Sequence, residues 1–143
     1  HIYGVLEKQF RRYYKEANRR SGITGTNLLQ ILESRLDNVV YRSGFARTRP
    51  QARQLVNHGH FLVNGKKVDI PSYQVRQDDV VSIKERSKET FAVQHAIDTI
   101  DRSAPEWLDV DVDKRAATVS LVPSREQIDT EIKEQLIVEL YSK

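Results

Sequence analysis

With 143 residues, the chain can form one ordinary hydrophobic core or two small linked lobes, and its net charge of +3 makes it mildly basic. It contains no Cys, which excludes disulfide bonds and thiolate metal sites and favours a cytoplasmic location. No apolar run approaches the roughly 18 residues of a membrane span and no signal peptide is recognised, so we expect no membrane partner. Because the chain opens with His1 and has no Met, we also expect a part of a longer product.

The charge is unevenly distributed along the chain. Residues 1–88 hold 17 Lys and Arg against 8 Asp and Glu, a net charge of +9, whereas residues 89–143 hold 6 against 12, a net charge of −6. Between Asp37 and Asp69 there are 31 consecutive residues without a single acid. Such asymmetry indicates a polyanionic partner for the first part of the chain.

The first third of the chain has the apolar period of helices. Residues 3–20 repeat apolar side chains near every 3.6 positions, which predicts an amphipathic helix, and residues 21–26 read as a loop. A second helix is expected over 27–36. It either continues or kinks as far as Gly44, a typical C-terminal stop.

A further helix is predicted to begin at Thr48. The sequence Thr48-Arg49-Pro50-Gln51 has the form of a capping box, in which the threonine caps the helix and Gln51 reaches back to the Thr48 N–H. Pro50 is tolerated because first-turn N–H groups have no helical partner. We expect this helix to end at Gly59 and to bury Ala52, Leu55 and Val56.

From residue 60 onward the apolar period changes to two. Asn64-Gly65 is a strong hairpin signal, and further strands are predicted over 72–75, 79–83 and 117–122. Residues 89–101 have the pattern of a short helix. The last stretch, 130–143, suits a helix, although its Leu-Ile-Val triplet suits a strand as well.

No arrangement of residues indicates an active site, a cofactor or a metal. The chain lacks the phosphate-binding, dinucleotide-binding and zinc-protease motifs. Asp109, Asp111 and Asp113 resemble the start of a calcium loop, but the Gly and Glu that such a loop requires later are missing, so we interpret them as the solvated face of a strand. His58 and His60 are unlikely metal ligands because residues two apart do not share a helix face.

The basic residues around Thr48 favour a phosphate ligand. Arg47, Arg49 and Arg53 are predicted to crowd one helix N-terminus, where free N–H groups and the helix dipole already attract anions. Arginine offers forked hydrogen bonds to phosphate oxygens. Further cations are expected to extend this surface: Lys66 and Lys67 after the hairpin turn, and Arg11, Arg12 and Lys15 on the first helix. Recognition of folded RNA by phosphate and shape fits this pattern better than base readout by a DNA-binding dimer.

Residues 33–83 resemble the small RNA-binding module named after ribosomal protein four of the small subunit. Nine residues occupy positions of the module's motif: Arg35, Leu36, Asp37, Thr48, Arg49, Ala52, Arg53, Asn64 and Gly65. The flanks 2–17 and 134–143 resemble the bacterial ribosomal protein itself. The resemblance implies an α+β fold, in which a helical lobe (1–32 and 125–143) accompanies an RNA-binding module (33–124) of paired helices packed on a small antiparallel sheet.

That resemblance also implies the partners and the site. We expect a non-catalytic component of the small ribosomal subunit that binds 16S-type rRNA, nucleates subunit assembly and represses its own operon in some bacteria. Expected neighbours are ribosomal protein five and, near the mRNA entry channel, ribosomal protein three and mRNA. The alternative is the RNA-binding module of an RNA-modifying enzyme such as a pseudouridine synthase. The expected rRNA-binding residues are Lys8, Arg11, Arg12, Lys15, Arg35, Arg47, Thr48, Arg49, Arg53, Gln54, His58, Lys66 and Lys67.

Overall fold

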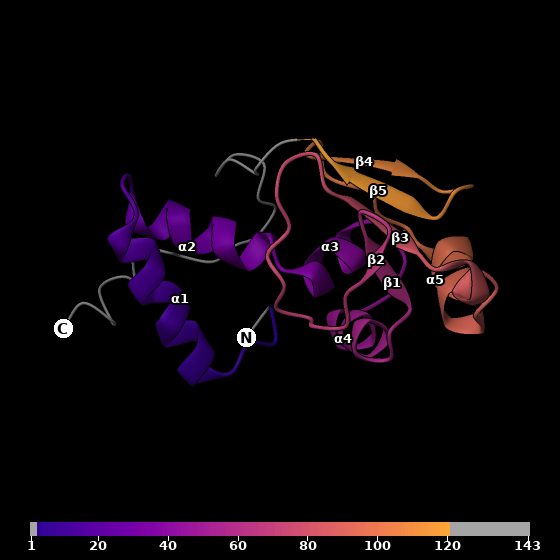
Figure 1. Ribbon diagram of the computed structural model, residues 1–143, viewed down its shortest axis with the longest axis horizontal. Coiled ribbons are helices and arrows are strands. Elements are labelled where there is room, and N and C mark those ends of the chain that lie inside the picture. Colours follow the sequence, from indigo (N-terminus) through magenta and orange to yellow (C-terminus); the bar gives the residue numbers. More distant parts are fainter. Residues whose placement is uncertain (1–2, 121–143) are drawn as a thin grey trace.

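The computed structural model describes residues 3–120 and combines helices with one antiparallel sheet. Helices α1 (Glu7–Arg19) and α2 (Thr24–Glu33) lie at one end, and the sheet with helix α5 (Phe91–Thr99) lies at the other (Figure 1). Helices α3 (Leu36–Arg42) and α4 (Arg49–Asn57) lie between them. The predicted α+β class is confirmed. No helix in this part of the chain is long and apolar enough to cross a membrane.

Helices α1 and α2 pack against each other around a small apolar core of their own. The predicted loop between them is shorter than expected, because α2 already begins at Thr24. The segment before α1 is not helical, but it contributes two buried side chains. The core consists of Tyr3, Val5, Ala17, Leu28, Leu29, Ile31 and Leu32.

The helical pattern from 27 onward is interrupted at Ser34 and Arg35, so of the two alternatives the chain breaks rather than continues. The break is stabilised by a distant segment. The Leu36 N–H donates to the carbonyl of Tyr73 at 2.8 Å, and the Val75 N–H donates to the carbonyl of Ser34 at 2.9 Å. The expected strand 72–75 is therefore reduced to a single bridge with Arg35. This arrangement satisfies the backbone groups that the break leaves open.

The turn between α3 and α4 follows the capping prediction with one correction. Gly44 adopts φ +87°, a left-handed conformation that ends α3, and the Thr48 Oγ1 accepts the N–H of Gln51 at 3.1 Å. The Gln51 side chain, however, accepts the N–H of Arg47 at 2.7 Å and not that of Thr48. The side chain of Gln51 therefore binds the backbone one residue before the cap, at Arg47.

The sheet has five antiparallel strands in the order β2-β1-β3-β5-β4. They are β1 (Phe61–Val63), β2 (Lys66–Lys67), β3 (Val80–Ile83), β4 (Leu108–Asp111) and β5 (Ala116–Val119). The predicted hairpin turn is confirmed: Asn64 and Gly65 both have positive φ, as a two-residue hairpin with native twist requires. Asp109 and Asp111 lie exposed on β4, as expected for a solvated strand face, whereas Asp113 lies in the following turn.

The larger core lies between the sheet and helices α3 and α4. Phe45 and Phe61 are fully buried with ring centroids 6.3 Å apart, and Trp107 is fully buried as well. The two apolar clusters agree with a division near residue 33, but the proposed domain boundaries stay a prediction. The predicted C-terminal element 130–143, the lobe segment 125–143 and the end of the strand 117–122 lie outside the described residues.

Candidate RNA interface

Helix α4 presents a polar face opposite its buried one. Ala52, Leu55 and Val56 turn into the core, so residues on the other side of the helix must face solvent. Gln54 and His58 are exposed and Arg53 is half-buried. The whole helix lies in the acid-free stretch, so no carboxylate of its own neutralises this face.

The β1–β2 hairpin brings two lysines beside the end of α4. Lys66 and Lys67 are exposed on the edge strand β2. Gly59 follows α4 with φ +78°, and a Cβ atom built there would lie 2.7 Å from the Lys67 Cε. The lysine stem therefore packs over the glycine, which joins the hairpin cations to the exposed face of α4. Both lysines lie where the sequence predicted them.

Arg49 is stacked between two tyrosines. Its guanidinium carbon lies 4.3 Å from the ring centroid of Tyr41 and 5.0 Å from that of Tyr3. Burial, followed by the charge of Arg42, lowers the pKa of Arg49. No described carboxylate forms an ion pair with it. The charge is therefore held between aromatic faces, and the nearby Glu33 charge offsets it only in part.

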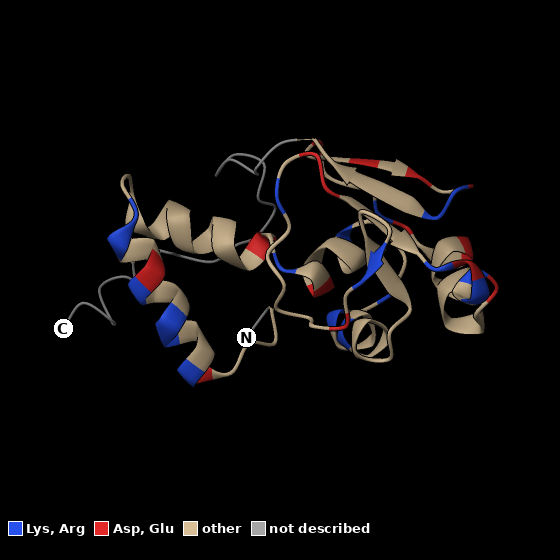
Figure 2. Cartoon of the chain, in the orientation of Figure 1, with Lys and Arg blue, Asp and Glu red and all other residues tan. Residues whose placement is uncertain are grey.

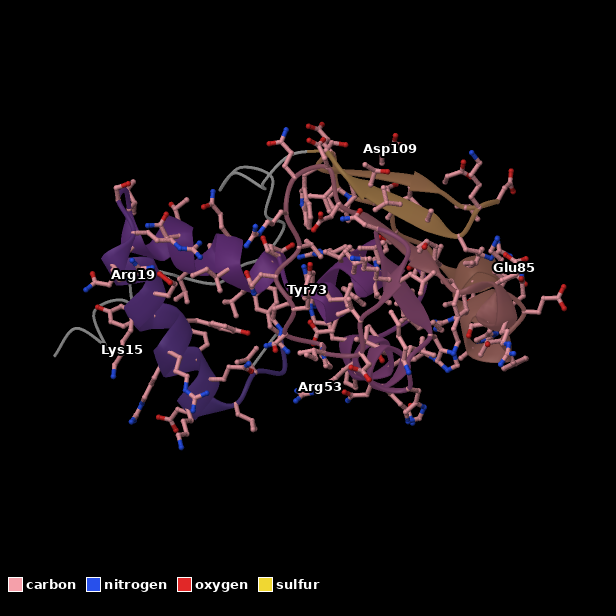
Figure 3. All side chains as sticks on the ribbon, viewed as in Figure 1. Lys15, Arg19, Arg53, Tyr73, Glu85 and Asp109 are labelled. Atoms are coloured by element: carbon pink, nitrogen blue, oxygen red, sulfur yellow. The ribbon has the colours of Figure 1, made fainter. Side chains whose placement is uncertain are left out.

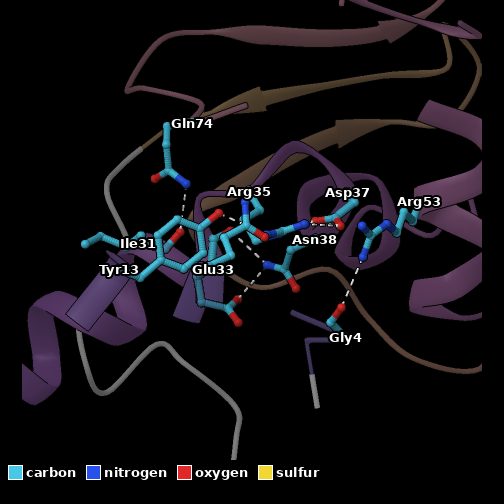
Figure 4. Close-up of polar contacts among 10 residues, drawn as sticks. Gly4, Tyr13, Ile31, Glu33, Arg35, Asp37, Asn38, Arg53 and Gln74 are labelled. Carbon is cyan, nitrogen blue, oxygen red and sulfur yellow. Dashed lines mark hydrogen bonds and ion pairs between the residues drawn. The ribbon is translucent and has the colours of Figure 1, made fainter. Parts of the chain in front are cut away.

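The three arginines near Thr48 contact different segments and do not form the single cluster that the sequence predicted. The exposed Arg47 donates through Nη1 to the hydroxyl of Thr99, the last residue of α5. Arg53 donates through Nη1 to the carbonyl of Gly4 at 3.1 Å (Figure 4). The prediction of one cluster was wrong because side-chain reach allows each arginine to find a partner outside its own helix.

Arg35 does not belong to an exposed interface, which corrects its place among the expected rRNA-binding residues. Its side chain is 1% exposed and forms a forked pair with Asp37, at 3.0 and 2.9 Å (Figure 4). Its Nη1 also donates to Gln9 at 3.1 Å and to Tyr13 at 2.9 Å. Burial opposes its charge, but the bonds and charge of Asp37 outweigh this and raise the pKa of Arg35. A phosphate could not reach this guanidinium.

A second buried pair neutralises Arg42. The Arg42 Nε and Nη2 each donate to Glu33, at 3.2 Å, and Asn38 donates to the same carboxylate at 3.1 Å. Tyr3 donates its hydroxyl to Glu33 as well. Burial, and then the Glu33 charge, raise the pKa of Tyr3. Arg42, a cation of the acid-free stretch, is therefore neutralised by Glu33, which precedes that stretch in the sequence.

Helix α1 carries a separate basic stripe. At about 100° per residue, five cations fall within an arc of about 100° that faces away from the helix core. Glu7 and Glu16 flank this stripe and pair with Arg11 at 2.9 Å and Arg19 at 2.7 Å. Three of the five form no ion pair with a described residue. The stripe comprises Lys8, Arg11, Arg12, Lys15 and Arg19, and the unpaired cations are Lys8, Arg12 and Lys15.

Comparisons with known proteins show which family the chain resembles. Residues 34–81 match the S4 domain, and residues 1–33 match the Ribosomal protein S4/S9 N-terminal domain. The chain is 60% identical over 144 residues to "Small ribosomal subunit protein uS4" of Acidothermus cellulolyticus, covering 99% of this chain and 69% of that relative. It is 63% identical over 142 residues to the protein of the same name in Mycolicibacterium smegmatis, covering 99% and 71%.

The chain belongs to the uS4 family. Its relatives are named as ribosomal proteins and not as RNA-modifying enzymes, so a non-catalytic role is supported and the enzyme alternative is not. The residues that match the N-terminal domain, 1–33, hold α1 and α2, and those that match the S4 domain, 34–81, hold α3, α4, β1, β2 and the beginning of β3.

Charge in this member of the uS4 family is segregated in space as well as in sequence. Lys15 and Arg19 lie on α1 at one end of the molecule, whereas Glu85 and Asp109 lie toward the other end (Figure 3). In Figure 2, Lys and Arg mark α1 and the α4 region, with some acid on α1, whereas β4 carries acid and the surroundings of α5 carry both signs. A polyanion would therefore be attracted mainly to the first end.

The rings of His58 and His60 in this uS4-family chain have centroids 6.4 Å apart, and the described residues contain no group of three metal-ligating side chains. The His60 Nδ1 lies 2.7 Å from the hydroxyl of Ser87. Burial, followed by the charges of Lys84 and His58, lowers the pKa of His60. The lowered pKa favours the uncharged form of the His60 ring beside the basic surface.

Sequence reasoning missed three residues that shape this surface: Tyr3, Tyr41 and Arg102. Tyr41 lies under two guanidinium groups, those of Arg49 and Arg102. A tyrosine inside a helix rich in apolar residues gives no signal of that role, because the arginines that stack on it come from other segments.

Proposed function

We propose that the chain is a structural component of the small ribosomal subunit that binds 16S-type rRNA through its phosphates and its shape. The observation that carries the proposal is the exposed basic surface made by α4 and the β1–β2 hairpin, where no described carboxylate pairs with Arg47, Arg49 or Arg53. Arginines without an ion-pair partner offer charge-assisted bonds to phosphate oxygens. The names of the relatives agree with this role.

The contact residues follow from exposure. The first contact surface, called the α4 surface, consists of residues of the α4 region and the hairpin: Arg47, Thr48, Arg53, Gln54, His58, Lys66 and Lys67. Arg49 lies behind it. The α1 stripe supplies a second contact through Lys8, Arg11, Arg12 and Lys15. Because the two surfaces lie on different parts of the molecule, we infer that the chain binds two neighbouring helices of a folded RNA and not one extended strand.

The family resemblance extends the proposal to assembly and regulation. Under it, the chain binds rRNA early in subunit assembly, lies beside ribosomal proteins five and three near incoming mRNA, and represses its own operon in some bacteria. These partners are proposals that rest on the family alone. Localisation at the ribosome in the cytoplasm belongs to the same proposal.

The salt dependence of rRNA binding tests the proposal. Arg53→Ala is expected to weaken binding to a 5′-domain fragment of 16S-type rRNA and to reduce the slope of log K against log [salt] by about one. Arg86→Ala removes the same charge from an exposed position near Glu85, outside the basic surface, and serves as the matched control.

Two further measurements separate the alternatives. A duplex DNA competitor is expected to displace the protein far less well than folded rRNA does. Equal competition would favour a DNA-binding role, and an unchanged salt slope in Arg53→Ala would remove this residue from the interface. A uridine-modification assay with the same RNA is expected to detect no product.

A further inference from the structure

The end of α5 and the residues that follow it lie against the turn that leads into α4. The hydroxyl of Thr99 accepts a hydrogen bond from the side chain of Arg47. A Cβ atom at Gly44 would lie 3.8 Å from the side chain of Ile100, so this side chain covers the glycine. Arg102 reaches the same turn from two residues further on. Three contacts from one short segment thus meet a turn that is more than fifty residues away in the chain.

Arg102 makes the most extensive of these contacts. Its Nη2 donates to the carbonyl of Tyr41 at 2.7 Å and to that of Ala46 at 3.1 Å, and its Nη1 lies 3.5 Å from the carbonyl of Arg47. The first carbonyl belongs to the last turn of α3 and also accepts the N–H of Gly44 at 3.1 Å, and the second lies just before the α4 cap. One guanidinium therefore links the end of α3 to the beginning of α4.

The same guanidinium also lies over an aromatic ring that it shares with Arg49. Its central carbon is 3.8 Å from the Tyr41 ring centroid, and that of Arg49 is 4.3 Å away. Arg102 forms no ion pair with a described carboxylate. Its planar, forked geometry is what allows two carbonyl bonds and stacking at once, and a lysine ammonium cannot reproduce this combination.

We propose that the segment 99–102 positions the rRNA-binding turn 43–48, with Arg102 as the principal positioning residue. The inference rests on the proposed rRNA-binding function and deepens it. By holding the turn, the segment fixes the direction of Arg47 and the start of α4, from which phosphate contacts are made. The segment lies outside the residues 34–81 that match the S4 domain, so the interface depends on a part of the chain beyond that match.

The charge-preserving variant Arg102→Lys tests the proposal, with Arg86→Lys as the matched control. We expect Arg102→Lys to bind the 5′-domain rRNA fragment about tenfold more weakly, as the loss of one charge-assisted bond network implies. Hydrogen exchange of the free protein is expected to be faster at residues 43–48 and unchanged in α1 and α2. Arg86→Lys should alter neither measurement.

A double-mutant cycle separates positioning from a general loss of stability. If Arg102 acts through the turn, Arg47→Ala costs less affinity in the Arg102→Lys background than in the wild type. Additive losses, or wild-type affinity and exchange in Arg102→Lys, would overturn the proposal. If Arg102→Lys does not fold, Thr99→Val tests the same segment, because it removes the acceptor of Arg47 together with the bond from the Thr99 hydroxyl to the His95 carbonyl. It should then give faster exchange near residue 47 and weaker binding, and wild-type behaviour counts against the proposal.

Failure of this inference can be told apart from failure of the proposed function. If the wild-type protein does not bind the rRNA fragment, the proposed function is wrong, whereas the exchange measurement on the free protein still reports whether residues 99–102 hold the turn.

Discussion

Arg35 and Arg49 show two ways of removing an arginine from water within one small protein. Arg35 is almost fully buried and is matched by the carboxylate of Asp37, by Gln9 and by Tyr13. Arg49 is half-buried and rests on the rings of Tyr3 and Tyr41 without a described carboxylate partner. The Arg35 charge is neutralised inside the protein, whereas the Arg49 charge remains available to attract an anion.

The difference teaches that a basic sequence stretch does not by itself define a binding surface. What matters is where each cation's counter-charge comes from. Arg35 and Arg42 receive theirs from Asp37 and Glu33 and thereby stabilise the junction between the first helix pair and the rest of the fold. Arg49 forms no ion pair with a described carboxylate, and the nearby Glu33 charge does not prevent burial from lowering its pKa.

The largest effect is expected from breaking the Arg35 pair. Asp37→Ala leaves a buried guanidinium without its carboxylate, and we expect the free energy of unfolding to fall by about 3–5 kcal/mol. Urea denaturation monitored by circular dichroism measures the change. Glu16→Ala, which breaks exposed pairs with Arg19 and Arg20, is the control and should cost at most about 1 kcal/mol. A loss below 1 kcal/mol in Asp37→Ala would show that the pair contributes little.

A smaller effect is expected from the cap of α4, which changes no charge. Thr48→Ala removes the acceptor of the Gln51 N–H and should lower the free energy of unfolding by about 1 kcal/mol. Binding should weaken only modestly, and the slope of log K against log [salt] should stay as in the wild type, because no phosphate-binding cation is lost. A changed slope would mean that the cap controls the number of phosphate contacts.

The smallest stability change is expected for Arg49→Met, which is compared directly with Arg35→Met. Arg49→Met keeps a flexible apolar stem between the two tyrosines and removes only a charge that is costly to bury, so the free energy of unfolding should change by less than about 1 kcal/mol. Arg35→Met instead strands Asp37 and should cost several times more. The two variants are compared by urea denaturation, and rRNA affinity is measured for Arg49→Met, which should bind more weakly. Equal stability losses would contradict the distinction between the two arginines.

Local signals in the sequence were sufficient for most of the secondary structure. The Thr48 cap, the Gly44 and Gly59 stops and the Asn64-Gly65 turn depend on short-range backbone chemistry, and each occurs as expected. The break at Ser34 and Arg35 could not be decided from the sequence, because its stability comes from carbonyl and amide groups of residues 71–75. Strand β4 was anticipated only through the alternation of its aspartates.

The candidate site was predicted less completely than the fold. Exposure of Gln54, His58, Lys66 and Lys67 follows from helix period and hairpin register, both of which are local. The roles of Arg35 and Arg102 are not local: one depends on α1 and the other on a turn more than fifty residues earlier. Spacing along the chain carries no information about which carboxylate, carbonyl or ring an arginine will meet.

The edge strand β2 has a consequence for the protein before it meets any partner. An unpaired strand edge is a template on which a second copy can extend the sheet, and a chain made in large amounts would be exposed to that hazard. Here the edge is only two residues long and both are lysines, so a second copy would bring like charges together. The same two side chains that we assign to RNA thus also protect the newly made protein from self-association.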